Sequence, residues 1–504
     1  MAIGRPTFRS KGAVLGTLAM AACTTVGPDY EAPDIAIPSS FSAGPAKMAF
    51  ADPVLLQTWW RQFDDPVLDR LIAAAWAGNL DRREAASRIR EARAREIVAG
   101  ASGRPQVGLA AEAAHNRLSE NAGVTLPGQA PGAVPGLPGS EFSTFRLGFD
   151  ASWEIDLWGE VRRATEAAGA RTQAEQWHAR DVDVALAAEI ARQYFDWRAL
   201  RVRITIAREA LARQRDIAGL IDARARNGLV SVQDVEQQGR QVERAAAAVP
   251  PLEAEAGIRV HMLALLLGTF PDRIVDALSA PAVPAPSSAA LPAVPVGLPS
   301  DLLRRRPDIR MAERRLAGAT ADIGTAVAAL YPRISLTGAL QLVSTSLASI
   351  VSADSIQAMA GGAFALPLLD GGRNRANVRI EEERRNQALT AYERQILVAF
   401  KDVEDALSRC QHERERTQSL DRAATAARAA ADTARIRYRA GLTPLLDVLE
   451  SESASLVLED ELAVSRSQQV QNLISLYKAL GGGWADERTS TGTRHREELE
   501  DGRN

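Results

Sequence analysis

Residues 226–235 read Arg226-Asn-Gly-Leu-Val-Ser-Val-Gln-Asp-Val235, and residues 439–448 read Arg439-Ala-Gly-Leu-Thr-Pro-Leu-Leu-Asp-Val448. The two stretches lie 213 positions apart. Other pairs of matching residues continue the pattern upstream: Gly159 with Gly372 at the same interval, and Asp81 with Asp308 and Pro105 with Pro332 at an interval of 227. The first half therefore has 14 additional residues, within a Pro- and Gly-rich stretch at 123–139. Insertions are tolerated in such loops, which explains why the two halves differ in length. Because the repeat interval is far longer than a solenoid unit, the sequence predicts an internal duplication.

The duplication, together with the composition of the two ends, predicts six segments along the chain. They are a signal peptide (1–22), a lipidated N-terminal segment (23–65), a first structural repeat (66–270), a Pro/Ala-rich linker (271–299), a second structural repeat (300–484) and a charged, disordered tail (485–504). Each repeat is predicted to run as helix, strand pair, very long helix, turn and helix.

The N-terminus has the features of an export signal. Basic residues precede an apolar stretch at 13–22, which ends at Cys23 and is too short to span a bilayer. The small residues Ala21 and Ala22 before Cys23 favour a bacterial lipoprotein in which Cys23 is acylated, and each buried CH₂ of the lipid would contribute about 0.8 kcal/mol to anchoring. The alternative is a cleaved signal with an incidental cysteine.

Two segments alternate between apolar and polar residues, the first of them strictly. In residues 144–157 every second side chain is apolar, and residues 333–342 repeat the pattern. Such alternation predicts strands with one apolar face, which suit either a soluble sandwich or a membrane barrel with a wet lumen. The lipoprotein signal favours the barrel. Two strand pairs per chain would leave unpaired edges, so we expect oligomerisation, and three copies would give twelve strands.

Two long stretches, residues 160–226 and 372–439, lack proline and are rich in good helix formers. About 67 residues of helix would span roughly 100 Å. A narrow apolar stripe follows helical spacing in both stretches: Ile190, Tyr194, Trp197, Leu200 and Ile204, then Tyr392, Ile396, Val403, Leu407 and Cys410. Such helices suit coiled-coil packing, either as a solid rod or as a wall that is wetted on both sides.

Composition excludes several classes of function. The 504 residues are 46% hydrophobic and 24% charged with a net charge of −3, which argues against wholesale disorder and against a nucleic-acid binder. The five histidines do not approach ligand spacing, and Cys23 and Cys410 lack a CxxC context. No GxSxG, HExxH or P-loop motif is present. We therefore predict no metal, no cofactor and no enzymatic activity.

The ordered motifs along the chain resemble the TolC-like outer-membrane factors, and among them the lipid-anchored NodT-type efflux proteins. The matching stretches are Ala21–Pro33, Trp59–Leu68, Asn79–Asp81, Glu154–Gly159, Gly297–Ile309, Ala321–Gly324 and Leu476–Trp484. The resemblance implies a mixed, mostly α-helical homotrimer in the outer membrane. Its twelve-stranded transmembrane β-barrel, with four strands per chain, would continue through a mixed equatorial region into a long periplasmic α-helical barrel. It also implies docking to a periplasmic adaptor and an inner-membrane transporter of the RND type.

Each predicted long helix is followed by a short turn and a second helix. A glycine permits the turn, and a hydroxyl can cap the helix that follows. The turn residues are Gly228, Leu229 and Ser231 in the first half and Gly441, Leu442 and Thr443 in the second. Capped hairpins alone would account for them, and the resemblance implies in addition that these tips contact the adaptor.

The second hairpin carries two carboxylates on one helix face, at Asp447 and Glu450, where the first half has Asp234 and Gln237. They could be a solvated helix N-terminus. Threefold symmetry would instead place six carboxylates around a narrow mouth. By resemblance, Tyr438, Asp447 and Glu450 match the periplasmic constriction of the family. Family members often have Asp at the position of Glu450, and some have Arg or Asp at the position of Thr443, which leaves open how this gate is held shut.

We therefore predict the exit duct of a tripartite efflux pump, which passively exports small molecules through a trimeric tunnel gated at its periplasmic tip. Three alternatives compete with this hypothesis. They are the duct of a type I protein-secretion system, a lipid-anchored periplasmic coiled coil without a pore, and an enzyme.

Overall fold

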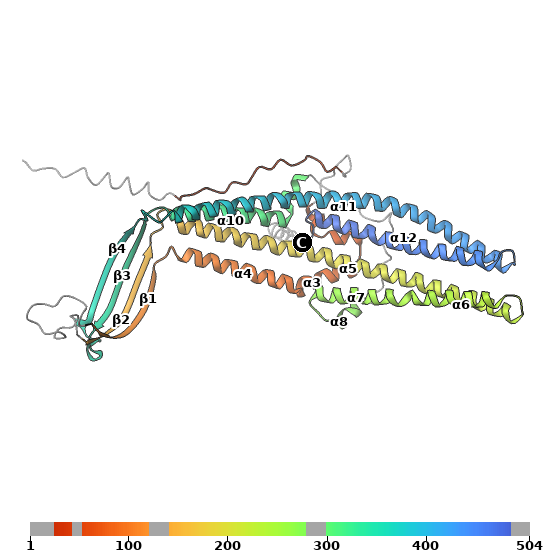
Figure 1. Cartoon of the computed structure of the whole chain (residues 1–504), viewed down its shortest axis with the longest axis horizontal. Helices are drawn as coiled ribbons and strands as arrows, with labels where there is room; N and C mark the ends of the chain where they lie inside the picture. Colours follow the sequence, from red (N-terminus) through yellow and green to blue (C-terminus); the bar gives the residue numbers. More distant parts are fainter. Residues whose placement is uncertain (1–24, 43–52, 120–140, 279–298, 485–504) are drawn as a thin grey trace, which may run out of the picture. The chain divides into compact units, whose positions relative to one another are not determined.

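The computed structural model describes residues 25–42, 53–119, 141–278 and 299–484 (Figure 1). They form two compact units, each built from matching parts of both repeats. The sheet unit takes its described residues from 25–33, 90–119, 141–173 and 313–390, and the tip unit from 34–42, 53–89, 174–278, 299–312 and 391–484. The predicted signal peptide, Cys23 and the tail at 485–504 lie outside the described residues.

The bounds of the elements reproduce the duplication. Helix α10 (Pro307–Ala328) begins 227 residues after α4 (Leu80–Ala101), and β3 (Arg333–Ser344) follows β1 (Gln106–Arg117) at the same interval. Helix α11 (Arg373–Arg439) begins 213 residues after α5 (Glu160–Arg226), and both have 67 residues. The predicted long helices and the mixed, mostly α fold are therefore confirmed.

The two halves differ after the tips. In the second half a single helix, α12 (Leu445–Ala479), leaves the turn, whereas the first half has α6 (Val232–Ala247) and α7 (Val249–Leu267), which meet at Ala248. Pro250 and Pro251 explain the break, because proline has no N–H for the helical ladder and is tolerated in the first helical turn.

Short elements complete the chain. They are α2 (Pro53–Gln57), η1 (Trp59–Phe63), α3 (Pro66–Gly78), α8 (Asp272–Leu278), η3 (Pro299–Asp301), α9 (Leu302–Arg305), η4 (Leu347–Ser349) and η5 (Ala353–Ser355). No helix within the described ranges is both long and apolar enough to cross a membrane.

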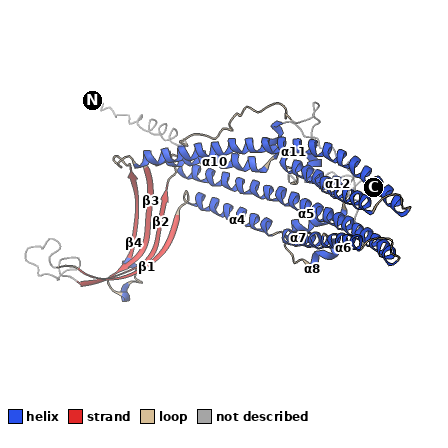
Figure 2. Cartoon of the chain, turned by 45° about the vertical axis from the view of Figure 1, so that its right-hand side comes forward, coloured by secondary structure: helices blue, strands red, loops and turns tan. Residues whose placement is uncertain are grey.

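The sheet unit contains one antiparallel sheet in the order β1-β2-β3-β4, drawn in red in Figure 2. Strand β2 (Glu141–Glu154) lies three residues upstream of the predicted 144–157, and β4 (Ile356–Ala365) completes the second pair. The difference at its end arises because the chain leaves the ladder before Gly159, whose φ of +82° precedes α5.

Each face of this sheet has one chemical character. Leu109, Phe149 and Leu340 are direct neighbours across three strands, and each exposes more than half of its surface. The opposite face carries Glu112 opposite Arg146, with 3.6 Å between their charged groups. The predicted alternation is thus confirmed, and the apolar face is not covered by the rest of the described chain.

The first described residues are fixed to the sheet unit through Arg163 on α5. Its guanidinium donates to the carbonyls of Val26 (3.1 Å) and Gly27 (3.3 Å) and pairs with Asp29 (2.7 Å). Gly27 has φ +87°, and a Cβ there would come within 2.4 Å of Gly324 Cα. Only glycine fits this close approach, which explains the glycine in the motif Val26-Gly27-Pro28-Asp29.

In the tip unit, cross-helix contacts order the helices as α6 and α7, then α5, α12 and α11. Most of the predicted stripe is buried: Ile190 and Tyr194 on α5 and Val403 on α11 expose at most 1% of their surface, whereas Trp197 and Cys410 are only partly buried. At the start of α3, the Asp65 carboxylate accepts hydrogen bonds from Tyr194 Oη (2.8 Å) and Arg198 (2.6 Å) as well as from two backbone amides. These four hydrogen bonds offset part of the desolvation cost of burying the carboxylate.

Candidate functional site

The two predicted tips are closed by the same backbone turn. Gly228 (φ +70°) and Gly441 (φ +75°) occupy the left-handed region, where glycine is favoured. The amide of Leu229 donates to the Arg224 carbonyl (3.0 Å), and that of Leu442 donates to the Arg437 carbonyl (2.9 Å). This pattern satisfies the last carbonyls of a helix. Both leucines point into solvent, with about 70% of their surface exposed (72% and 69%).

The helices that leave the tips begin differently. Ser231 forms a capping box with Asp234: each backbone amide donates to the other residue's side chain at 3.1 Å. In the second half, the position before the helix is Pro444, which has neither an N–H nor a hydroxyl, and no side-chain cap is present. Thr443 therefore does not cap α12, contrary to the sequence prediction, and its hydroxyl has no hydrogen-bond partner among the described residues.

The predicted gate residues fall into two environments. Asp447 and Glu450 lie on the exposed face of the first turns of α12, and neither side chain forms a hydrogen bond or ion pair within the described chain. Glu450 lines a shallow groove together with Gln237, its counterpart in the first half. Tyr438 is instead 7% exposed and packs in an apolar cluster with Ile221 and Val448.

Arg224 joins the two hairpins next to these residues. Its guanidinium carbon lies 4.6 Å from the centre of the Tyr438 ring, and Nη2 donates to the Tyr438 carbonyl at 3.4 Å. Arg224 belongs to α5 and Tyr438 to α11, so the contact crosses from one hairpin to the other. The sequence did not indicate this contact, because the repeat matches equivalent positions but does not show which side chains of the two halves touch.

Further from the tips, buried charges link the same hairpins. Glu452 on α12 is 5% exposed and pairs with Arg213 on α5 (3.4 Å) and Arg435 on α11 (2.7 Å). Glu459, one turn beyond Ser455, pairs with Arg428 at 2.9 Å. Since removing one partner of a buried pair leaves an uncompensated charge, these links resist separation of the helices along their middle part.

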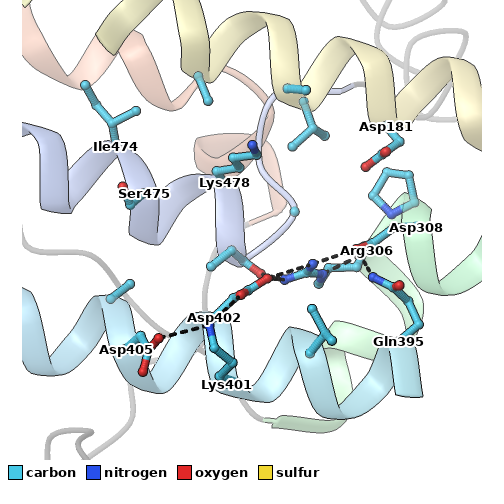
Figure 3. Close-up of a pocket in the computed structure, with 18 of the residues that line it drawn as sticks. Asp181, Arg306, Asp308, Gln395, Lys401, Asp402, Asp405, Ile474, Ser475 and Lys478 are labelled. Carbon is cyan, nitrogen blue, oxygen red and sulfur yellow. Dashed lines mark hydrogen bonds and ion pairs between the residues drawn. The ribbon is translucent and has the colours of Figure 1, made fainter. Parts of the chain in front are cut away.

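A polar cavity of about 490 Å³ lies at the far end of α12, between α5, α11 and the start of α10 (Figure 3). Its wall carries both signs of charge, including Asp181, Lys478, Lys401 and Asp405. Burial raises the pKa of Asp181, and the nearby Asp308 carboxylate adds to the shift.

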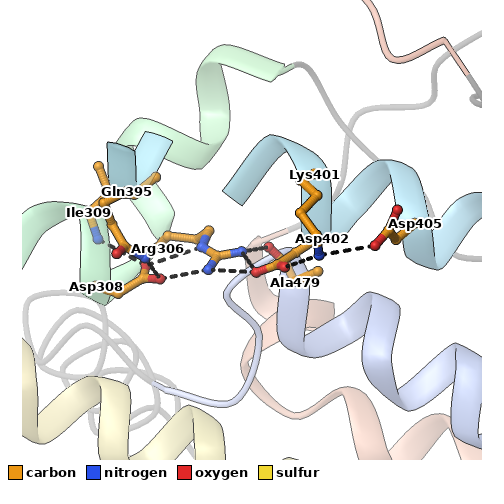
Figure 4. A network of polar contacts seen from close by, with 8 residues as sticks. All are labelled: Arg306, Asp308, Ile309, Gln395, Lys401, Asp402, Asp405 and Ala479. Carbon is orange, nitrogen blue, oxygen red and sulfur yellow. Dashed lines mark hydrogen bonds and ion pairs between the residues drawn. The ribbon is translucent and has the colours of Figure 1, made fainter. Parts of the chain in front are cut away.

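Arg306 closes one side of this cavity and holds three elements together (Figure 4). Its guanidinium pairs with Asp308 (2.6 Å) and Asp402 (3.3 Å), and Nη1 donates to the carbonyl of Ala479 at 3.0 Å. Ala479 is the last residue of α12, where a cation is favoured by the helix dipole. The predicted motif around Arg306 and Asp308 is thus a structural corner with every charge paired, and its arrangement offers no activated nucleophile.

The sequence analysis also considered Cys410 and metal binding. Cys410 is half-buried on α11, and burial raises the pKa of its thiol to about 11, so the unreactive thiol form prevails at neutral pH. Within the described ranges, no group of three or more His, Cys, Asp or Glu residues could hold a metal ion.

Comparison with known sequences matches almost the whole chain. The family model described as outer membrane efflux protein matches residues 71–269 and 298–482. The pyoverdine export outer membrane protein OpmQ of Pseudomonas putida is 33% identical over 469 residues, which are 93% of this chain and 96% of the relative. The cation efflux system protein CusC of Escherichia coli (strain K12) is 30% identical over 472 residues, or 92% and 97% of the two chains.

Solved structures give the same result for the fold. The outer-membrane channel OprN superposes with a TM-score of 0.81 at 35% identity, over 91% of this chain and 99% of that one. The open state of the Neisseria gonorrhoeae MtrE outer membrane channel gives 0.78 at 25% identity, over 91% and 98%. On these matches, and with the duplicated helix and strand pattern they share, the chain belongs to the outer membrane efflux protein family.

Proposed function

We propose that three copies of this chain assemble into the exit duct of a tripartite efflux pump in the outer membrane. The observation that carries the proposal is the sheet with one apolar and one polar face. A strand lattice of this kind suits a barrel that has lipid outside and water inside. The strands have 10 to 14 residues, which is enough to cross a bilayer when tilted.

The proposed assembly closes the sheet through its edges. In the described sheet, β1 and β4 are each paired on one side only. A lipid-facing sheet cannot leave such edges open, so the β4 edge of one copy would pair with the β1 edge of the next. In the tip unit, the two outer helices expose apolar side chains that the same head-to-tail contact would cover: Leu397 and Ile436 on α11, and Ile258 and Leu265 on α7. A head-to-tail contact that closes forms a ring.

We place the gate at the second hairpin, with Asp447 and Glu450 of three copies forming a ring of six carboxylates. Such a ring binds cations and repels anions. The exposed Leu229 and Leu442, each next to a glycine turn, would meet the helical tips of a periplasmic adaptor. The inner-membrane transporter, which we expect to be of the RND type, would supply the energy, so that the duct itself works without catalysis.

Small molecules are the substrates that we propose for this duct. One relative carries pyoverdine export in its name and another cation efflux, which fits a duct that discriminates weakly. Lipidation of Cys23 would add a membrane anchor to each copy.

The proposal is tested with the full-length protein purified in detergent. Native mass spectrometry should give a trimer, and electron microscopy a particle with a central bore. In planar bilayers we expect ion channels whose cation selectivity falls when Asp447→Ala and Glu450→Ala are combined. A monomer that remains soluble without detergent would overturn the duct, and unchanged conductance and selectivity in the double variant would remove these residues from the gate.

A further inference from the structure

We infer that Arg224 is a positioning residue of the gate, which holds the second hairpin against the first through Tyr438. This inference rests on the proposed function. It answers the question that Thr443 and Glu450 leave open, since neither residue links the hairpins in the described chain.

The Arg224–Tyr438 contact lies close to both turns. Arg224 lies four residues before Gly228, and Tyr438 lies three residues before Gly441. The other polar links between the hairpins among the described residues lie further from the turns and begin with Arg213 on α5. Among the polar links between the hairpins in the described residues, Arg224 is therefore the one nearest to both turns.

A guanidinium 4.6 Å from a ring centre is within the range of a cation–π interaction. The Tyr438 carbonyl that accepts from Arg224 also accepts from the Gly441 amide at 2.9 Å, within the turn itself. Arg224 thus binds both the aromatic ring and the backbone of the turn of the second hairpin.

Ile217 and Ile221, on the α5 turns before Arg224, pack with Tyr438 and Val448 in one apolar cluster. Val448 directly follows Asp447, so the cluster fixes the backbone that carries the gate carboxylate. Any opening that moves α11 and α12 away from α5 must break the Arg224 contact and expose this cluster to water.

The test compares Arg224→Ala with Arg226→Ala in single-channel recordings of the full-length trimer. Arg226 is a matched control, because it is exposed, lies two residues away, and bonds to the Asp222 carbonyl of its own helix. Loss of a partly desolvated cation–π contact should raise the ratio of open to closed states about fivefold in the first variant and leave it unchanged in the second. Arg224→Lys should fall between the two, since it keeps the charge but loses the planar donor group.

Tyr438 provides the second arm. Tyr438→Phe keeps the ring and the carbonyl and should behave as the unaltered protein, whereas Tyr438→Leu should open the channel as Arg224→Ala does. Combining Arg224→Ala with Tyr438→Leu should add little to either single change. Equal open probability in Arg224→Ala and Arg226→Ala, or a Tyr438→Phe effect as large as that of Tyr438→Leu, would overturn the inference. If Asp447→Ala with Glu450→Ala changes selectivity while Arg224→Ala changes nothing, only the role of Arg224 fails; if neither has an effect, the proposed gate fails as well.

Discussion

The apolar face of the sheet makes a prediction that separates a lipid-facing sheet from a water-exposed one. Leu109 and Ala110 are adjacent on β1, both are exposed in the single chain, and they point to opposite faces. We expect Leu109→Arg to impair insertion and Ala110→Arg to be tolerated. Leu109 is the fourth of twelve strand residues, somewhat away from mid-depth, so an arginine there should cost about 2 kcal/mol per chain. That cost corresponds to roughly a thirtyfold shift in the insertion equilibrium, repeated in every copy of the assembly.

The assay is the amount of assembled protein in outer-membrane fractions separated by density, followed by channel recordings from the same fractions. Leu109→Ala serves to separate loss of the side chain from gain of the charge, and should retain most of the assembled protein. Ala110 lies opposite Gly148, which in turn lies opposite Gln341 on the polar face of the sheet. Water can solvate the charge of an arginine there. Equal assembly of the two arginine variants would refute the assignment of the apolar face to lipid.

Three further predictions concern the tip unit. Arg306→Ala leaves Asp308 and Asp402 without their cation and should lower the free energy of unfolding by about 3 kcal/mol, with a smaller loss for Arg306→Lys, as measured by denaturant titration. Asp181→Asn should raise the midpoint of thermal unfolding at pH 7. Because the pKa of Asp181 is raised in the folded state, protonated Asp181 stabilises the fold at low pH, and that stability is lost as pH rises through the folded pKa. The stability advantage of Asp181→Asn should therefore vanish below about pH 4. An advantage that grows on acidification would contradict the raised pKa. Pro444→Ser should create a capping box with Asp447 like that of Ser231 and Asp234, stabilise the tip by about 1 kcal/mol and weaken cation selectivity. Unchanged selectivity alongside a stabilised tip would show that capping does not compete with ion binding at the gate.

Periodicity and punctuation predicted most of the fold. The long helices were predictable within one residue because Gly228 and Gly441 end them and no proline interrupts them. The strand after residue 140 was placed three residues too far along. Its alternation continues through Ile155, whose amide still donates to the Ile334 carbonyl at 2.9 Å although the ladder assignment has ended. Side-chain alternation and backbone pairing need not stop at the same residue.

Contacts across the duplication could not be predicted in the same way. The turn residues and the exposed carboxylates belong to local motifs, so the sequence indicates them. The partner of Tyr438 is 214 positions away, and Arg306 reaches Asp402 over 96 positions. Which arginine meets which partner depends on how the helices pack, and arginine is abundant on both long helices, α5 and α11. Local pattern therefore identifies the candidates for a gate, whereas the structure is needed to find what holds it.

The duplication itself explains why one hairpin rather than the other would carry the gate. Asp234 and Asp447 occupy equivalent positions, and an acid at either one lies in the first turn of a helix. In the first hairpin, the backbone amide and the hydroxyl of Ser231 both donate to the Asp234 carboxylate, so that carboxylate is committed to the helix end. Pro444 has neither an N–H nor a hydroxyl to donate to the Asp447 carboxylate, which is thereby left for ions in the proposed gate. In the proposed gate, the difference between Ser231 and Pro444 at the cap position would thus turn one of two equivalent acids from a structural group into an ion-binding one.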